Sequence, residues 1–94
     1  MNKRELVAAA ARRTPLTQRQ VRQALDALLE AITDALTEGE PVALSDFGCF
    51  LVQSYPGRRL WRFDGPGSYV VEDRRLPVFR SSAALRRRVK EKDS

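Results

Sequence analysis

The stretch from Tyr55 to Arg75, YPGRRLWRFDGPGSYVVEDRR, decides the fold of this 94-residue chain. Asp64-Gly65-Pro66-Gly67 separates two β-prone runs, and Asp-Gly and Gly-Pro dipeptides mark turns, so the stretch predicts a long β-hairpin. An extended strand rises about 3.3 Å per residue, so residues 55–63 reach roughly 30 Å. That length is about the width of a small domain. We therefore expect residues 55–75, the predicted ribbon, to project from the rest of the chain and to need a partner.

Length and composition limit the kind of protein that this chain can be. The 94 residues are expected to form one domain, and the part outside the ribbon provides a core that is marginal for a monomer. The single Cys49 excludes an intramolecular disulfide, and the lack of histidine argues against a zinc site and removes the commonest general base. The amino-terminal residues contain no apolar signal segment, and no run is long enough to span a membrane. We expect a cytoplasmic protein that is not an enzyme and uses no cofactor, metal or small-molecule ligand.

The net charge of +5 is unevenly distributed. Residues 1–54 carry six Lys and Arg against seven Asp and Glu, whereas residues 55–94 carry eleven against five. A basic half beside a near-neutral half is typical of a protein that binds a polyanion. The alternative is that the arginines only keep the surface soluble.

Two helices are predicted before residue 40. Asn2 and Glu5 resemble a capping box for the first helix, and Thr17 with Gln20 forms one for the second, which Gly39 ends. The second helix has an apolar stripe at helical spacing, formed by Val21, Leu25, Leu28, Leu29, Ile32 and Leu36. Alanines widen this stripe, so one short neighbouring helix cannot cover it. We expect a second copy of the chain to cover it.

The rest of the chain reads mainly as strands. Residues 42–44 and 50–53 alternate around a tight turn at Asp46-Phe47-Gly48, and residues 76–79 form an extended return. Ser81 or Ser82 can cap a last helix from Ala83 to about Lys90, and the remaining residues form a tail. The predicted order is helix, helix, β-hairpin, ribbon, strand and short helix.

This order and several short motifs resemble the HU/IHF family of bacterial DNA-bending proteins. The matching stretches are Met1-Asn2-Lys3-x-Glu5-Leu6, Ala24-Leu25-Asp26-Ala27, Ala31-Ile32-Thr33, Val42-Ala43-Leu44, Phe47-Gly48-x-Phe50, Pro77-x-Phe79-Arg80 and Ala84-Leu85. No single motif is decisive, but all of them occur in order over nearly the whole chain.

The resemblance implies an α+β fold and an intertwined homodimer, with a heterodimer with a paralogue left open. Residues 1–39 would form the helical dimerisation base, 40–54 and 76–80 a sheet saddle, 55–75 a ribbon arm, and 81–94 the last helix and tail. The expected dimer core comprises Leu25, Leu28, Leu29, Ile32, Leu36, Phe47, Phe50 and Phe79. The ribbons would lie in the minor groove of double-stranded DNA, where cations neutralise phosphates and an apolar tip residue wedges between base steps.

The predicted DNA-contacting cations lie mainly on the ribbon and around the last helix. They are Lys3, Arg58, Arg59, Arg62, Arg74, Arg75, Arg80, Arg86 and Arg87. Ser81 or Ser82, with the start of the last helix, is a further candidate phosphate contact.

The ribbon tip departs from the family pattern. Phe63 stands where the family usually has its wedge proline, and Pro66, three residues on, is a second intercalating candidate. The alternative is that Phe63, Trp61 and Tyr69 pack across the ribbon strands as aromatic pairs. The turn also has Asp46 where the family commonly has glycine.

We therefore expect an architectural, nucleoid-associated DNA-binding protein with little sequence preference that bends or compacts DNA. Direct base reading looks weak because the ribbon has no Asn or Gln. Two alternatives remain: a dimeric scaffold that uses the apolar ribbon to bind protein, and an IHF-like site-specific DNA bender.

Overall fold

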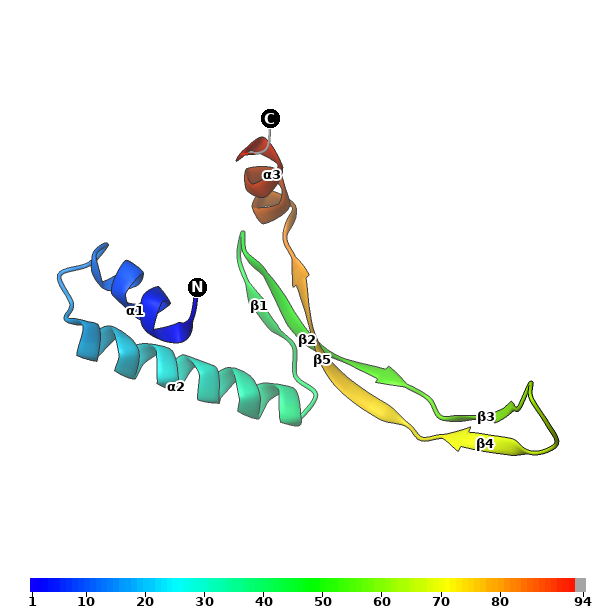
Figure 1. Ribbon diagram of the computed structural model, residues 1–94. Coiled ribbons are helices and arrows are strands. Elements are labelled where there is room, and N and C mark those ends of the chain that lie inside the picture. Colours follow the sequence, from blue (N-terminus) through cyan, green and yellow to red (C-terminus); the bar gives the residue numbers. More distant parts are fainter. Residues whose placement is uncertain (93–94) are drawn as a thin grey trace. The chain divides into compact units, whose positions relative to one another are not determined.

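The computed structural model describes residues 1–92 in two units, Met1–Ala35 and a second unit that begins at Leu36 (Figure 1). The tail predicted at residues 93–94 lies outside the described residues. The helices and antiparallel strands confirm the predicted α+β class. No helix within residues 1–92 is long and apolar enough to cross a membrane.

The first unit consists of α1 (Lys3–Ala11) and most of α2 (Gln18–Thr37). Asn2 caps α1, because its side-chain oxygen accepts from the Glu5 amide at 2.9 Å. Thr17 and Gln20 form the predicted reciprocal capping box, with hydrogen bonds of 3.0 and 3.1 Å. Both predicted helix starts are confirmed.

The apolar stripe of α2 is largely uncovered. Leu28 is 61% exposed and Leu29 is also exposed, while the other members of the stripe are half-buried. Val7 of α1 is the only buried hydrophobic residue in the described part of the chain. Neither unit therefore contains the core that a stable monomer of this size needs.

The second unit is organised by a three-stranded antiparallel sheet in the order β1-β2-β5. Its strands are β1 (Val42–Leu44), β2 (Gly48–Tyr55) and β5 (Arg74–Ser81). Gly39 follows α2 in the left-handed conformation (φ 77°), which confirms the predicted helix stop. The predicted tight turn also forms between β1 and β2, with Asp46 at φ 63° and a 3.0 Å bond from the Phe47 amide to Leu44.

Three phenylalanines pack on one face of this sheet. Phe50 and Phe79 are direct cross-strand partners, with ring centroids 4.9 Å apart, and Phe47 lies 5.5 Å from Phe79. A Cβ on Gly48 would come within 2.6 Å of the Phe79 ring and the Arg80 carbonyl, so no larger residue fits there. Phe47 and Phe79 are nevertheless exposed, so the three rings contact one another but remain accessible to solvent.

The predicted hairpin forms, but it is interrupted. The β2–β5 ladder ends at the Tyr55–Arg74 pair, and a separate ladder joins β3 (Arg58–Trp61) to β4 (Ser68–Val71) (Figure 1). Residues 56–57 and 72–73 belong to neither ladder, and we call them the joint; residues 58–71 are the arm. Pro56 has no amide hydrogen, and the Gly57 amide donates to a side-chain oxygen of Asp73 instead of to a strand carbonyl.

The last helix, α3 (Ala83–Lys92), is capped by Ser82, whose hydroxyl accepts from the Leu85 amide at 3.0 Å. Of the two predicted caps, Ser82 is therefore the one used. The Ser82 amide donates to the Phe47 carbonyl at 2.8 Å, which ties the start of α3 to the turn between β1 and β2.

Candidate nucleic-acid interface

The arm presents two different faces. The cross-strand pairs are Arg58–Val71, Arg59–Val70, Leu60–Tyr69 and Trp61–Ser68. Because neighbouring residues of a strand point to opposite sides, Arg59, Trp61, Ser68 and Val70 share one face, which we call the Trp61 face. Arg58, Leu60, Tyr69 and Val71 share the other, the Tyr69 face. Arg58 and Arg59, adjacent in sequence, therefore serve opposite sides of the arm.

The arm tip is a tight turn with an exposed ring. The Arg62 amide donates to the Gly67 carbonyl at 3.1 Å, and Gly67 has φ 111°, a conformation that favours glycine. Phe63 and Pro66 lie within this turn; both are exposed, and Phe63 completely so. Ring–ring contacts within residues 1–92 involve only the three phenylalanines of the sheet. The alternative in which Phe63, Trp61 and Tyr69 form aromatic pairs across the arm is therefore wrong.

The arginines of the arm are available to a ligand. In the described part of the chain, Arg58, Arg59 and Arg62 take part in no ion pair. The nearby acidic Asp73 is bonded to the Gly57 amide of the joint instead. Because guanidinium groups bind phosphates, these exposed arginines without carboxylate partners are free to do so.

The sheet divides the other predicted arginines between its two faces. Alternation along β5 places Arg74 and Arg80 on the face opposite the phenylalanines, and Arg75 on the phenylalanine face. Arg74 lies over the Tyr55 ring, 5.5 Å from its centroid. The Arg75 guanidinium lies near Gly39, because a Cβ added there would be 3.6 Å from it. Arg74 and Arg80 are thus brought onto one surface, and Arg75 is not.

The start of α3 holds Arg86 in place. Its guanidinium donates to the carbonyl of Ser81 and lies 3.5 Å from the Ser81 hydroxyl. Because Ser82 caps the helix, both serines are already engaged within the chain. Arg87 is exposed on α3. A phosphate contact by either serine stays a prediction.

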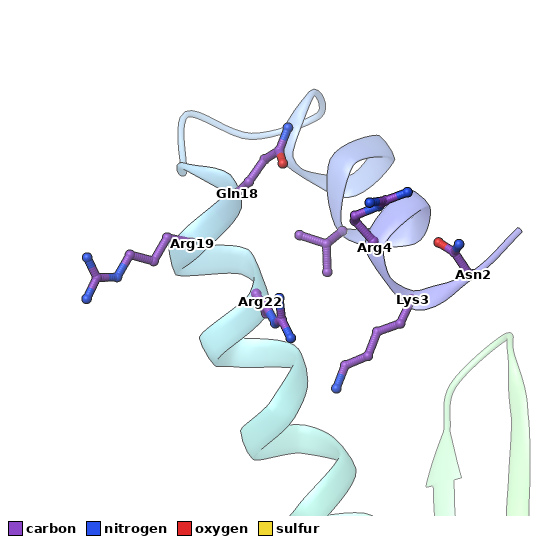
Figure 2. Close-up of a pocket in the computed structure, with 7 residues that line it drawn as sticks. Asn2, Lys3, Arg4, Gln18, Arg19 and Arg22 are labelled. Atoms are coloured by element: carbon purple, nitrogen blue, oxygen red, sulfur yellow. The ribbon is translucent and has the colours of Figure 1, made fainter.

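A basic hollow in the helical unit was not predicted from the sequence. It has a volume of about 730 Å³ and lies between α1 and the start of α2 (Figure 2). Lys3 and Arg4 project from α1, Arg19 and Arg22 project from α2, and Asn2, Val7 and Gln18 complete the lining. Arg19 and Arg22 are three residues apart and so neighbour each other on one helix face, which is the signal that could have identified them.

Lys3 is partly neutralised. Its ammonium lies 2.5 Å from Oδ1 of Asp26, an oxygen that is itself shielded from solvent. The hydrogen bond from Lys3 holds the pKa of Asp26 below its ordinary value, and the charge of Arg22 lowers that pKa further. Of the four cations in the basic hollow, Arg4, Arg19 and Arg22 have no ion-pair partner among the described residues. Within residues 1–92, no group of three or more metal-ligating side chains occurs.

The chain matches known proteins along almost its whole length. Residues 1–90 match the family model of the bacterial DNA-binding proteins. The chain is 37% identical over 90 residues to "DNA-binding protein HU" of Haemophilus influenzae and 32% identical to that of Thermotoga maritima. Each alignment covers 96% of this chain and 100% of the relative.

Solved structures show the same likeness. The HU of an Anabaena HU–DNA cocrystal structure is 31% identical, with a TM-score of 0.81 over 95% of this chain and 97% of that one. HU from Thermotoga maritima gives a TM-score of 0.69 at 30% identity, over 95% of this chain and 98% of that one. This chain belongs to the HU/IHF family of bacterial DNA-binding proteins.

Proposed function

We propose that the chain is an architectural DNA-binding protein that acts as a homodimer, holds double-stranded DNA with its arms and bends it. The observation that carries this proposal is the arm itself, a two-stranded ribbon with unpaired arginines and a completely exposed apolar tip. A cation-lined ribbon with an apolar wedge suits the minor groove. The family membership agrees with this function and favours neither alternative, the protein-binding scaffold or the site-specific bender.

The uncovered apolar surface supports the homodimer. The single chain exposes 8316 Å², whereas a compact monomer of 10.6 kDa exposes about 5,500 Å². Leu28 and Leu29 of the α2 stripe and two of the sheet phenylalanines, Phe47 and Phe79, contribute to the apolar part of this surface. A second copy carries the same stripe, so a twofold interface would cover both at once.

The proposed DNA contacts fall into four groups. Arg58, Arg59 and Arg62 of the arm contact phosphates along the groove, and Arg74 and Arg80 contact them from the sheet. Arg86 and Arg87 extend this set on α3, while Arg75 contributes less because it lies on the phenylalanine face. In the helical unit, the basic hollow adds Arg4, Arg19 and Arg22 to Lys3 as contacts for DNA that flanks the bend.

We assign the wedge to Phe63 and not to Pro66. Phe63 is completely exposed and flat, and phenylalanine is among the side chains that unstack base steps. Pro66 lies inside the turn closed by Arg62 and Gly67, where its fixed φ shapes the backbone. The cost of unstacking, a few kcal/mol per step, is offset by the phosphate contacts that the bend permits.

The test is binding to a short labelled duplex, intact and nicked, across a salt series. With about six to ten of these contacts made at once, the affinity falls by roughly 10³–10⁵ between 50 and 200 mM salt. Phe63→Ala should reduce bending, measured by energy transfer across the duplex, more than it reduces affinity, and Pro66→Ala is the matched control. No binding at low salt would refute the function, and unchanged bending in Phe63→Ala would refute only the wedge.

The proposal also covers location and chemistry. A protein that coats DNA without sequence preference is expected in the cytoplasm on the nucleoid. It is expected to bind and bend without catalysis, since phosphate contacts and an apolar wedge make or break no covalent bond.

A further inference from the structure

The joint between the sheet and the arm is weakly supported. Its residues belong to neither ladder, so the arm continues from β2 and β5 through two stretches without strand pairing (Figure 1). Pro56, Glu72 and Asp73 are exposed, and a hollow of about 530 Å³ opens beside the joint, between Gly57, Glu72, Asp73 and the base of the arm. Buried side chains therefore do not fix the direction of the arm.

One hydrogen bond crosses the joint in the part of the chain that the structure describes. The Gly57 amide donates to Oδ1 of Asp73, sixteen residues further along the chain. The approach is close, because a Cβ on Gly57 would overlap the Val71 carbonyl and lie 3.0 Å from that same oxygen of Asp73. Asp73 takes part in no ion pair among residues 1–92. We call the hydrogen bond between Gly57 and Asp73 the clasp.

The clasp acts at the end of a long lever. Phe63, the proposed wedge, lies six residues beyond Gly57, which is about 20 Å of extended chain. A rotation of about 10° at the joint would therefore move the wedge by about 3.5 Å, which is close to the rise of one base pair. Because the wedge has to enter one base step, the direction of the arm must be fixed at the joint to within about this angle.

We propose that Asp73 is a positioning residue for DNA bending: its carboxylate, held on the Gly57 amide, fixes the arm relative to the sheet and so directs Phe63 to its base step. The proposal rests on the bending function proposed above and adds to it a residue that acts without touching DNA. A hydrogen bond of this kind shifts an equilibrium about fivefold, which is enough to favour one direction of the arm over others.

The test compares two substitutions that remove the same charge from the joint. Asp73→Ala removes the clasp, whereas Glu72→Ala removes the neighbouring exposed carboxylate and leaves the clasp in place. Because both variants lose one negative charge, any general gain in attraction for DNA is shared between them. Asp73→Asn also loses the charge but keeps an oxygen that can accept from the Gly57 amide, so it should rescue what Asp73→Ala loses.

Bending is measured by single-molecule energy transfer across a short intact duplex at saturating protein, where differences in affinity no longer matter. Asp73→Ala should show a smaller mean bend and a broader distribution of bends, whereas Glu72→Ala and Asp73→Asn should match the wild type. Asp73→Ala should also bind the duplex about fivefold more weakly than Glu72→Ala. The thermal unfolding midpoint should be the same in all four proteins, so a loss of bending cannot be attributed to a loss of folding.

The clasp itself can be observed without DNA. An amide proton that is hydrogen-bonded to a carboxylate resonates downfield of a solvated one. In the nuclear magnetic resonance spectrum of the free protein, the Gly57 amide signal should therefore move upfield in Asp73→Ala and keep its position in Glu72→Ala. This measurement reports on the clasp whether or not the arm binds DNA.

Three outcomes would overturn the proposal. Equal bending by Asp73→Ala and Glu72→Ala at saturation would show that the clasp does not position the arm. A loss of bending in Asp73→Asn as large as that in Asp73→Ala would assign the effect to the charge of Asp73. An unmoved Gly57 signal in Asp73→Ala would show that the clasp does not form in solution. Failure of the wild-type protein to bind or bend the duplex would instead refute the underlying function, so the two failures are distinguishable.

Discussion

Helix α2 and the arm both expose large apolar side chains, but they distribute them differently. The apolar residues of α2 lie on one stripe, and the opposite side of the helix carries polar residues such as Gln23 and Glu30. The arm has apolar residues on both faces, and each face also carries an arginine.

This difference separates two kinds of partner. An uninterrupted stripe on one side of a helix is stabilised by a matching apolar surface that stays in place, as in an obligate dimer. Apolar rings interleaved with arginines suit a ligand that is itself part apolar and part anionic, and the ligand can leave without unfolding the arm. We therefore expect changes in α2 to affect folding and changes in the arm to affect binding.

The largest effect is expected from Leu28→Asp. This residue is 61% exposed in the single chain, so in the proposed homodimer the carboxylate would be buried without a partner. We expect the dimer to lose more than about 3 kcal/mol of stability, measured by denaturant unfolding and by sedimentation. Gln23→Asp, on the opposite side of α2, is the control and should change neither the stability nor the sedimentation of the dimer. A stable Leu28→Asp dimer would place the interface elsewhere.

A middle-sized effect is expected from reversing the charge of one arm face. If the Trp61 face meets DNA, Arg59→Glu should weaken binding to an intact duplex about tenfold and Arg58→Glu at most about threefold. The salt dependence of affinity should also be shallower for Arg59→Glu. A larger loss of affinity in Arg58→Glu than in Arg59→Glu would show that the Tyr69 face meets DNA. Equal losses would mean that phosphates contact both faces of the arm alike. Neither variant should change the stability of the dimer.

The smallest effect is expected at the Lys3–Asp26 ion pair. Because the folded state lowers the pKa of Asp26, the pair stabilises the protein at neutral pH, and this stabilisation is lost as pH falls through that lowered pKa. Asp26→Asn should have a slightly lower melting temperature than the wild type at pH 7, and the two should converge well below the ordinary aspartate pKa of about 4. Glu30→Gln, an exposed carboxylate on the same helix, is the control. A difference in melting temperature that persists at acidic pH would show that the substitution acts through packing and not through the ion pair.

Much of the backbone could be predicted because its signals are local. Asn2, Thr17 and Gly39 each act within one helical turn, so capping boxes and a left-handed stop can be identified from spacing alone. The hairpin tip could likewise be predicted, from the turn residues Asp64-Gly65-Pro66-Gly67. Alternating residues predicted the strands and the ribbon, and the family resemblance joined the strands into one sheet, which local signals do not connect.

The features that escaped prediction depend on register or on tertiary packing. The opposite facing of Arg58 and Arg59 follows only once β3 is paired with β4. The basic hollow requires α1 to lie against α2, which places Arg4, Arg19 and Arg22 around one hollow. The joint was missed because Pro56 and Gly57 read equally well as ribbon residues, and only the pairing shows that the ladder stops there.

The joint has a consequence for how the protein opens. Cooperative unfolding spreads along a sheet through consecutive ladder hydrogen bonds, and at the joint the Gly57 amide is bonded to the Asp73 carboxylate instead. We therefore expect the arm to be a separate foldon that can melt and re-form while β2 and β5 remain paired. Amide hydrogen exchange should show one protection level for residues 58–71 and a higher one for residues 48–55, with the boundary at Pro56.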